Sequence, residues 1–177
     1  MITLGIDPGI TGAISIFDDD DDLDNKTRLV DPRLVDVFDL PTMQIGKSKQ
    51  LNSSALSKLI KKYMYWTEWS PYSTPKMIAY VEKVGAMPGQ GVTSMFNFGM
   101  GYGAIQGVLA AHHIPYKLVT PQKWKKYYNL TGKDKDCART LAIQQFPKAE
   151  LNLKKHIGRA DAILIGRYGV KNEKNNY

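Results

Sequence analysis

Three acidic residues stand alone in apolar stretches of the sequence. Asp7 ends the run LGID and is followed at once by Pro-Gly, Glu82 ends MIAYVE, and Asp161 lies in GRADAILIG. A buried carboxylate costs several kcal/mol unless hydrogen bonds or a cation offset its charge. Three that converge cannot all stay ionised without a cation, and oxygen-only ligands favour Mg²⁺ or Mn²⁺ over zinc. The pattern favours one shared metal site over the alternative of three separate structural roles, such as capping by turn amides.

A basic stretch with interleaved aromatic residues suggests a second kind of chemistry. Residues 101–177 carry 14 basic and 5 acidic side chains, whereas residues 1–100 carry 10 and 12. Such asymmetry indicates a polyanionic partner for the second half of the chain. The densest part spans 123–139, where lysines and aromatic side chains are typical of a phosphate-binding surface. The alternative is an amphipathic helix with Trp124 and Tyr128 in the core and lysines that only keep the surface soluble.

Composition limits the class of protein. The chain has 177 residues, of which 43% are hydrophobic, and this suits one α/β domain over 1–177 with a frayed tail at 170–177. No apolar run approaches the ~20 residues that span a bilayer, and the start MITLGID lacks signal-peptide features. One cysteine, Cys137, excludes an internal disulfide framework. We expect a cytoplasmic protein, in the host cytoplasm if it is viral, with no membrane partner and no small-molecule cofactor.

The elements that must position the acids follow from periodicity and turn signals. Apolar, β-branched runs predict strands, helical spacing predicts helices, and the acidic run 18–25 is expected at a solvated hairpin tip, with 42–50 as a loop. The predicted strands are 2–7, 11–17, 34–40, 77–84 and 115–119; the predicted helices are 52–65, 93–112, 121–128, 134–146 and 158–168. This order predicts a mixed five-stranded sheet with helices on its faces. The ends of the first and fourth strands, with Asp7 and Glu82, then approach each other if those strands are neighbours.

Small residues recur every four positions in the helix after Glu82. Gly99, Gly103, Gly107 and Ala111 therefore share one face. Each Gly costs a helix interior about 1 kcal/mol relative to Ala, so close packing against a neighbour is the expected compensation. That neighbour is either the chain's own sheet or a second protomer, and the sequence leaves both open.

Four segments, taken in their order and spacing, resemble the RuvC-type Holliday junction resolvases, and more closely their bacteriophage relatives. They are GIDPGITGA, VEKVGAMPGQGVTSMFNFGMGYGAIQGVLAA, TPQKWKKYYNLTGKDK and GRADAILIG, and the resemblance covers nearly the whole chain. It implies an RNase H-like fold, a homodimer, and paired Mg²⁺-dependent nicks across a four-way DNA junction. Carried over by motif, Asp7, Glu82 and Asp161 fall on metal-binding acids of the family.

The sequence departs from the cellular members of the family at two places. Those members carry an acid or a His three residues before the last Asp, and here that position is Gly158. His156 is then the nearest side chain able to bind metal or act as a base, although an isolated His near a helix start is more often a surface or capping residue. Those members also place an aromatic wedge, which prises junction bases apart, in the loop after the second acid. The loop in this sequence lacks an aromatic residue, and Met87 is the candidate to replace it. The alternative is a plain flexible loop.

The resemblance also suggests which basic residues meet DNA. It places Lys123 or Lys126, and Lys133 or Lys135, near the active-site lysines of the family. The full set of expected DNA contacts is Lys123, Lys126, Lys133, Lys135, Arg139 and Met87.

The predicted function is resolution of four-way DNA junctions in recombination and repair, by hydrolysis at a site with two Mg²⁺ ions for which Mn²⁺ can substitute. The catalytic set is Asp7, Glu82, Asp161 and His156. Alternatives are a related RNase H-like nuclease acting on flap, branched or RNA substrates, and a non-catalytic junction-binding module. An actin-like phosphotransferase, which IDPGITG also resembles, needs two duplicated domains, and 177 residues hold one.

Overall fold

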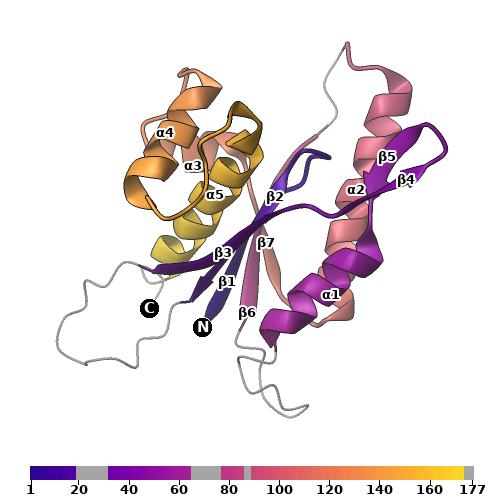
Figure 1. The fold of residues 1–177 in the computed structure, drawn as a ribbon, viewed down its shortest axis with the longest axis horizontal. Helices are drawn as coiled ribbons and strands as arrows, with labels where there is room; N and C mark the ends of the chain where they lie inside the picture. The colour runs from indigo at the N-terminus through magenta and orange to yellow at the C-terminus, as the bar shows by residue number, and fades with distance from the viewer. Residues whose placement is uncertain (19–31, 65–76, 86–88, 174–177) are drawn as a thin grey trace.

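Five strands form one mixed sheet in the order β3-β2-β1-β6-β7 (Figure 1). The structure is a computed structural model that describes residues 1–18, 32–64, 77–85 and 89–173. The β1–β2 and β2–β3 pairs are antiparallel, and the β1–β6 and β6–β7 pairs are parallel. The strands are β1 (Ile2–Asp7), β2 (Ala13–Asp18), β3 (Arg33–Asp39), β6 (Met77–Glu82) and β7 (Tyr116–Val119). The predicted mixed five-stranded sheet is confirmed.

Helices cover both faces of this sheet (Figure 1). On one side lie α1 (Ser53–Met64) and α2 (Val92–Ala111), and on the other lie α3 (Pro121–Tyr127), α4 (Lys135–Gln145) and α5 (Ile157–Glu173). Several begin at a side-chain cap: Asn52 Oδ1 accepts from the Ala55 N–H at 3.0 Å, and Asp134 Oδ1 accepts from the Asp136 N–H at 2.7 Å. Within the described residues, no helix is long and apolar enough to cross a membrane.

The sheet separates two hydrophobic cores. One joins β1, β2 and β6 to α1 and α2 through residues such as Leu4, Leu56 and Ile105, all buried. The other joins the opposite face to α3, α4 and α5 and includes Trp124 and Leu164. Because β1 and β2 are buried on both faces, they read as continuous apolar runs rather than as alternating ones.

Helix α5 lies very close to β1 and β2, and glycines make this possible. A side chain at Gly5 would run into the Ala162 carbonyl oxygen and the backbone of Gly166. The buried Ser15 hydroxyl donates to the Ala162 carbonyl at 2.7 Å and ties β2 to the helix. This close packing brings the first turns of α5, and with them Asp161, next to the end of β1.

Two sequence predictions about the elements are wrong. Residues predicted as a loop at 42–50 form a hairpin of β4 (Thr42–Ile45) and β5 (Ser48–Leu51), turning at Gly46 with φ +59°. The strands are polar and largely exposed, so no apolar alternation marked them. The tail predicted to fray from 170 is helical through Glu173, because Val170 is buried in the second core. The acidic residues 19–24 and the last residues 174–177 lie outside the described residues.

Candidate active site

Asp7, Glu82 and Asp161 come from three elements that meet at one edge of the sheet. β1 and β6 are parallel neighbours in the register Ile6 to Val81, so Asp7 and Glu82 end adjacent strands at the same edge. Asp161 stands near the start of α5, which packs on β1. All three side chains are half-buried. The structure thus brings together the acids that the sequence singled out.

The electrostatics of these carboxylates show that they share one environment. Burial, followed by the neighbouring Glu82 charge, raises the pKa of Asp7 from 3.8 to about 6. Burial, followed by the charges of Asp7 and Glu82, raises the pKa of Asp161 to about 7. Burial also raises the pKa of Glu82. Each pKa is raised because burial or a neighbouring carboxylate destabilises the ionised form. An added cation would therefore stabilise the ionised forms.

The turn after Asp7 offsets only part of its charge. The backbone N–H of Gly9 donates to the carboxylate and lowers its pKa, but burial and Glu82 outweigh this contribution. Gly158, three residues before Asp161, is packed directly against this turn. A side chain there would run into the Thr11 carbonyl oxygen, and its Cβ would stand 3.3 Å from Asp7 Oδ2. No side chain fits at position 158, so this position supplies no fourth ligand.

Two lysines face the acids. The ammonium charges of Lys125 and Lys135 lower the pKa of both Asp7 and Asp161. Lys135 was one of the residues predicted from the sequence, but Lys125 was not, since the prediction there was Lys123 or Lys126. Lys123, Lys126 and Lys133 are exposed.

Trp124 is a further site residue that the sequence prediction missed. Its indole Nε1–H donates to Glu82 Oε1 at 2.8 Å, and the ring is fully buried. The Lys125 ammonium lies 5.3 Å from the centre of the same ring. The core interpretation of Trp124 is therefore confirmed, but the buried N–H also needs an acceptor, and it uses a candidate metal ligand. Trp124 thereby fixes the orientation of Glu82.

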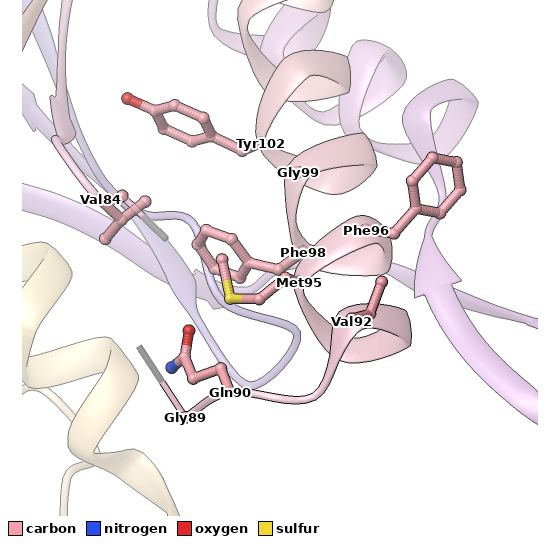
Figure 2. Close-up of a pocket in the computed structure, with 10 residues that line it drawn as sticks. Val84, Gly89, Gln90, Val92, Met95, Phe96, Phe98, Gly99 and Tyr102 are labelled. Atoms are coloured by element: carbon pink, nitrogen blue, oxygen red, sulfur yellow. The ribbon is translucent and has the colours of Figure 1, made fainter. Parts of the chain in front are cut away.

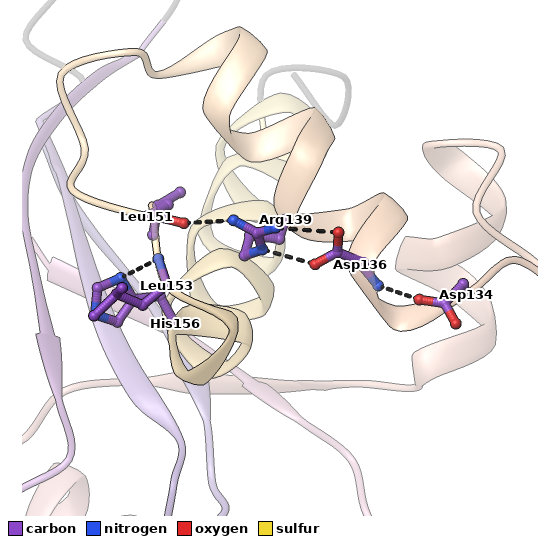
Figure 3. Close-up of polar contacts among 6 residues, drawn as sticks. All are labelled: Asp134, Asp136, Arg139, Leu151, Leu153 and His156. Carbon is purple, nitrogen blue, oxygen red and sulfur yellow. Dashed lines mark hydrogen bonds and ion pairs between the residues drawn. The ribbon is translucent and has the colours of Figure 1, made fainter.

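Arg139 and His156, both predicted as site residues, lie in two other sets of polar contacts (Figure 3). The Arg139 guanidinium donates to Asp136 at 2.7 and 3.1 Å and to the Leu151 carbonyl at 2.9 Å. These bonds hold α4 to the segment before α5, which gives the guanidinium a structural role. His156 is only 8% exposed, and its Nδ1 accepts from the Leu153 N–H at 3.4 Å.

The charges that act on His156 also separate it from the acids. Burial, then Arg159 and Lys155, lower its pKa, while Asp39 and Glu150 oppose this effect. None of these neighbours is one of the three site carboxylates. The burial and contacts of the imidazole favour the structural role that the sequence offered as the alternative. Met87, the predicted wedge, lies outside the described residues.

The donor set suits a hard divalent cation. Asp7, Glu82 and Asp161 offer only oxygen atoms, carry mutual repulsion, and lie beside two lysines that compensate it in part. In the described ranges, no group of three Asp, Glu, His or Cys side chains is close enough together to enclose an ion. The chemistry of the residues fits Mg²⁺ or Mn²⁺, and the carboxylates would have to draw together around it.

Comparison with known proteins gives the fold. No protein-family model and no curated protein matches the sequence. A Thermus thermophilus RuvC structure superposes with a TM-score of 0.62 at 16% identity, covering 99% of this chain and 97% of that one. A structure of T. thermophilus RuvC in complex with a Holliday junction substrate has a TM-score of 0.62 at 13% identity, covering 99% and 96%. The fold that the four sequence motifs implied is confirmed: the chain has the RNase H-like fold of the RuvC structures over nearly its whole length.

Proposed function

We propose that this protein is a structure-selective endonuclease that resolves four-way DNA junctions by paired hydrolysis of phosphodiester bonds. The observation that carries the proposal is the convergence of Asp7, Glu82 and Asp161 with Lys125 and Lys135 at one edge of the sheet. The shared fold supports it, because one of the similar structures holds a Holliday junction substrate.

The three carboxylates would hold the metal, as two Mg²⁺ ions that Mn²⁺ can replace. Such ions supply a nucleophile at neutral pH and neutralise the charge that develops on the leaving oxygen. The contribution of the chain itself is positional. Glu82 is held by the Trp124 indole N–H at 2.8 Å, and Asp7 is held by the turn that ends in Gly12.

Lysines would place the scissile strand. Lys125 and Lys135 carry positive charge toward the acids, so a phosphate that approaches this edge meets cations as well as carboxylates. The exposed Lys123, Lys126 and Lys133 extend the basic surface along α3 and the loop before α4. Contacts of this kind fix the register of DNA without reading its sequence.

A homodimer is part of the proposal, because a junction with two-fold symmetry needs two active sites related by a matching axis. The glycine face of α2 supports it. Beyond the helix's own backbone, a Cβ added at Gly99, Gly103 or Gly107 would meet no atom of the described residues within 4 Å, so these glycines do not pack on the chain's own sheet. Val92 and Phe96 on the same helix are 86% and 67% exposed. An apolar, small-residue surface of this kind suits a second copy of the helix.

The proposal is tested by a cleavage assay on a panel of substrates. A four-way junction, a linear duplex, a flap and an RNA–DNA hybrid are incubated with the protein, with and without Mg²⁺. We expect paired nicks at symmetric positions of the junction, only with metal. Preferential cutting of the flap or the hybrid would identify a related nuclease instead, and junction binding without cutting would identify a binding module.

A further inference from the structure

An open apolar cavity lies between the end of β6 and the start of α2 (Figure 2). Its volume is about 650 Å³, within the ~300–1,000 Å³ typical of small-ligand sites. Val84, Met95, Phe98 and Tyr102 point into the same space from the two elements. Among the described residues that line it, none is charged. The cavity therefore suits a flat, uncharged group.

The lining residues match the chemistry of a nucleobase. The Phe98 and Tyr102 rings are nearly parallel, with an interplanar angle of 15° and centroids 6.2 Å apart. Gln90 lies at the side of the cavity and offers an amide donor and acceptor (Figure 2). Proteins that hold unstacked bases combine aromatic faces with hydrogen-bonding groups in this way.

The cavity also lies at the right distance from the candidate active site. Val84 is two residues beyond Glu82, which is a chain path of at most about 7 Å. That length is about two nucleotide steps at ~3.4 Å per nucleotide along one strand. A base within a couple of nucleotides of a phosphate held by the three acids can therefore reach this part of the cavity lining.

We propose that this cavity binds one unstacked nucleobase of the junction strand that is cut, with the aromatic face of Phe98 as its main contact. The proposal rests on the proposed function, because it takes the position of the scissile phosphate from the three acids. It adds a base-binding site to a surface whose lysines are proposed to contact the DNA backbone. Bases next to a branch point are the natural occupants, because they have already lost a stacking partner.

A second copy of the chain is the competing occupant. On the exposed face of α2, Gly103, Gly107 and Met100 lie outside the cavity lining and remain available for a partner helix, whereas Gly99, Val92 and Phe96 also line the cavity. A dimer contact centred on Gly103, Gly107 and Met100 leaves the side with Phe98 and Tyr102 open to DNA.

The test is a thermodynamic cycle between one base and one side chain. Binding of four-way junctions is measured in EDTA, where cutting does not occur, after the wild-type nicks have been mapped with Mg²⁺. Each junction carries a single abasic nucleotide within about two nucleotides of the scissile phosphate. At one position the missing base should weaken wild-type binding about five- to 150-fold, the range for loss of one base–aromatic stack. Phe98→Ala should show the same loss on the intact junction and no further loss on that abasic junction.

Two further variants make the result specific. Phe98→Tyr keeps the aromatic face and should bind as the wild type does. Thr93→Ala truncates an exposed side chain on the same helix outside the cavity, and it should leave the abasic effect unchanged. Each variant is checked for wild-type circular dichroism.

The contradicting results are distinct. If the wild type nicks the junction but no abasic position couples to Phe98, the base site is wrong and the proposed function stands. If Phe98→Ala turns a dimer into a monomer in sedimentation, a second copy fills the cavity and the proposal is wrong. A wild-type chain that neither binds nor nicks the junction overturns the proposed function, and the base site with it. If Phe98→Ala does not fold, a wild type that is indifferent to every abasic position still overturns the proposal.

Discussion

Replacing Asp161 by Asn should stabilise the folded protein above neutral pH when no divalent metal is present. The pKa of Asp161 is raised from 3.8 to about 7 by burial and by the charges of Asp7 and Glu82. A raised carboxyl pKa means that the folded state favours the protonated form. The contribution of this carboxyl to the free energy of unfolding is therefore fully present below pH 3.8 and is lost as the pH rises through about 7.

The magnitude follows from the same pKa. A rise from 3.8 to about 7 corresponds to roughly 4 kcal/mol of unfolding free energy lost in the wild type near pH 8. Asn has nearly the same shape and no charge, so Asp161→Asn avoids this loss. We expect the variant to be about 2–4 kcal/mol more stable near pH 8 and nearly equal to the wild type near pH 4.

Urea unfolding in EDTA, followed by circular dichroism at several pH values, measures the difference. With a slope of about 2 kcal/mol/M, the variant's midpoint should lie about 1–2 M higher near pH 8. Glu150→Gln, which removes an exposed carboxylate, is the control. Its free energy of unfolding should stay within about 0.5 kcal/mol of the wild-type value at every pH. Added Mg²⁺ should stabilise the wild type and not Asp161→Asn, because only the wild type keeps all three ligands. A stability difference that does not grow between pH 4 and 8 would refute the shared acidic site.

Three further predictions concern Trp124, the site lysines and Gly103. Trp124→Phe removes the donor to Glu82, so nicking should slow by roughly tenfold or more and the half-maximal Mg²⁺ concentration should rise; an unchanged metal dependence would contradict the positioning role. Joint replacement of Lys125 and Lys135 by Ala should reduce the slope of log K against log salt by about 0.9 for each DNA phosphate that the variant no longer neutralises, as measured by junction binding; an unchanged slope would place the DNA-binding surface elsewhere. Gly103→Leu should give a folded monomer in sedimentation and single instead of paired nicks, and a variant that remains a folded dimer would move the dimer interface away from α2.

The sheet and the three acids were predictable because each has a local signature. Apolar runs that end in a lone carboxylate can be read without knowledge of distant contacts, and the parallel pairing of β1 and β6 then places Asp7 beside Glu82. The hairpin at 42–51 was not predictable in this way, because its exposed polar strands carry no alternation.

The side chains around the acids depend on tertiary packing. Along a short helix such as α3, each residue turns the side chain by about 100°, so the face that meets Glu82 is known only once the helix is docked. That is why Lys125 was missed beside Lys123 and Lys126. Arg139 is different: its spacing of three from Asp136 is a visible signal for an ion pair on one helix face, and that signal predicts the structural role.

The central claim is that Asp7, with Glu82 and Asp161, forms one metal-dependent site that cuts junctions. The most direct measurement compares the wild type with Asp7→Asn on a labelled four-way junction, with Mg²⁺, and measures nicking and binding on the same samples. Asp7→Asn removes one ligand charge and leaves Lys125 and Lys135 in place. It should therefore bind the junction with near wild-type affinity and produce no nicks. Nicking by Asp7→Asn at the wild-type rate would contradict the metal-site claim.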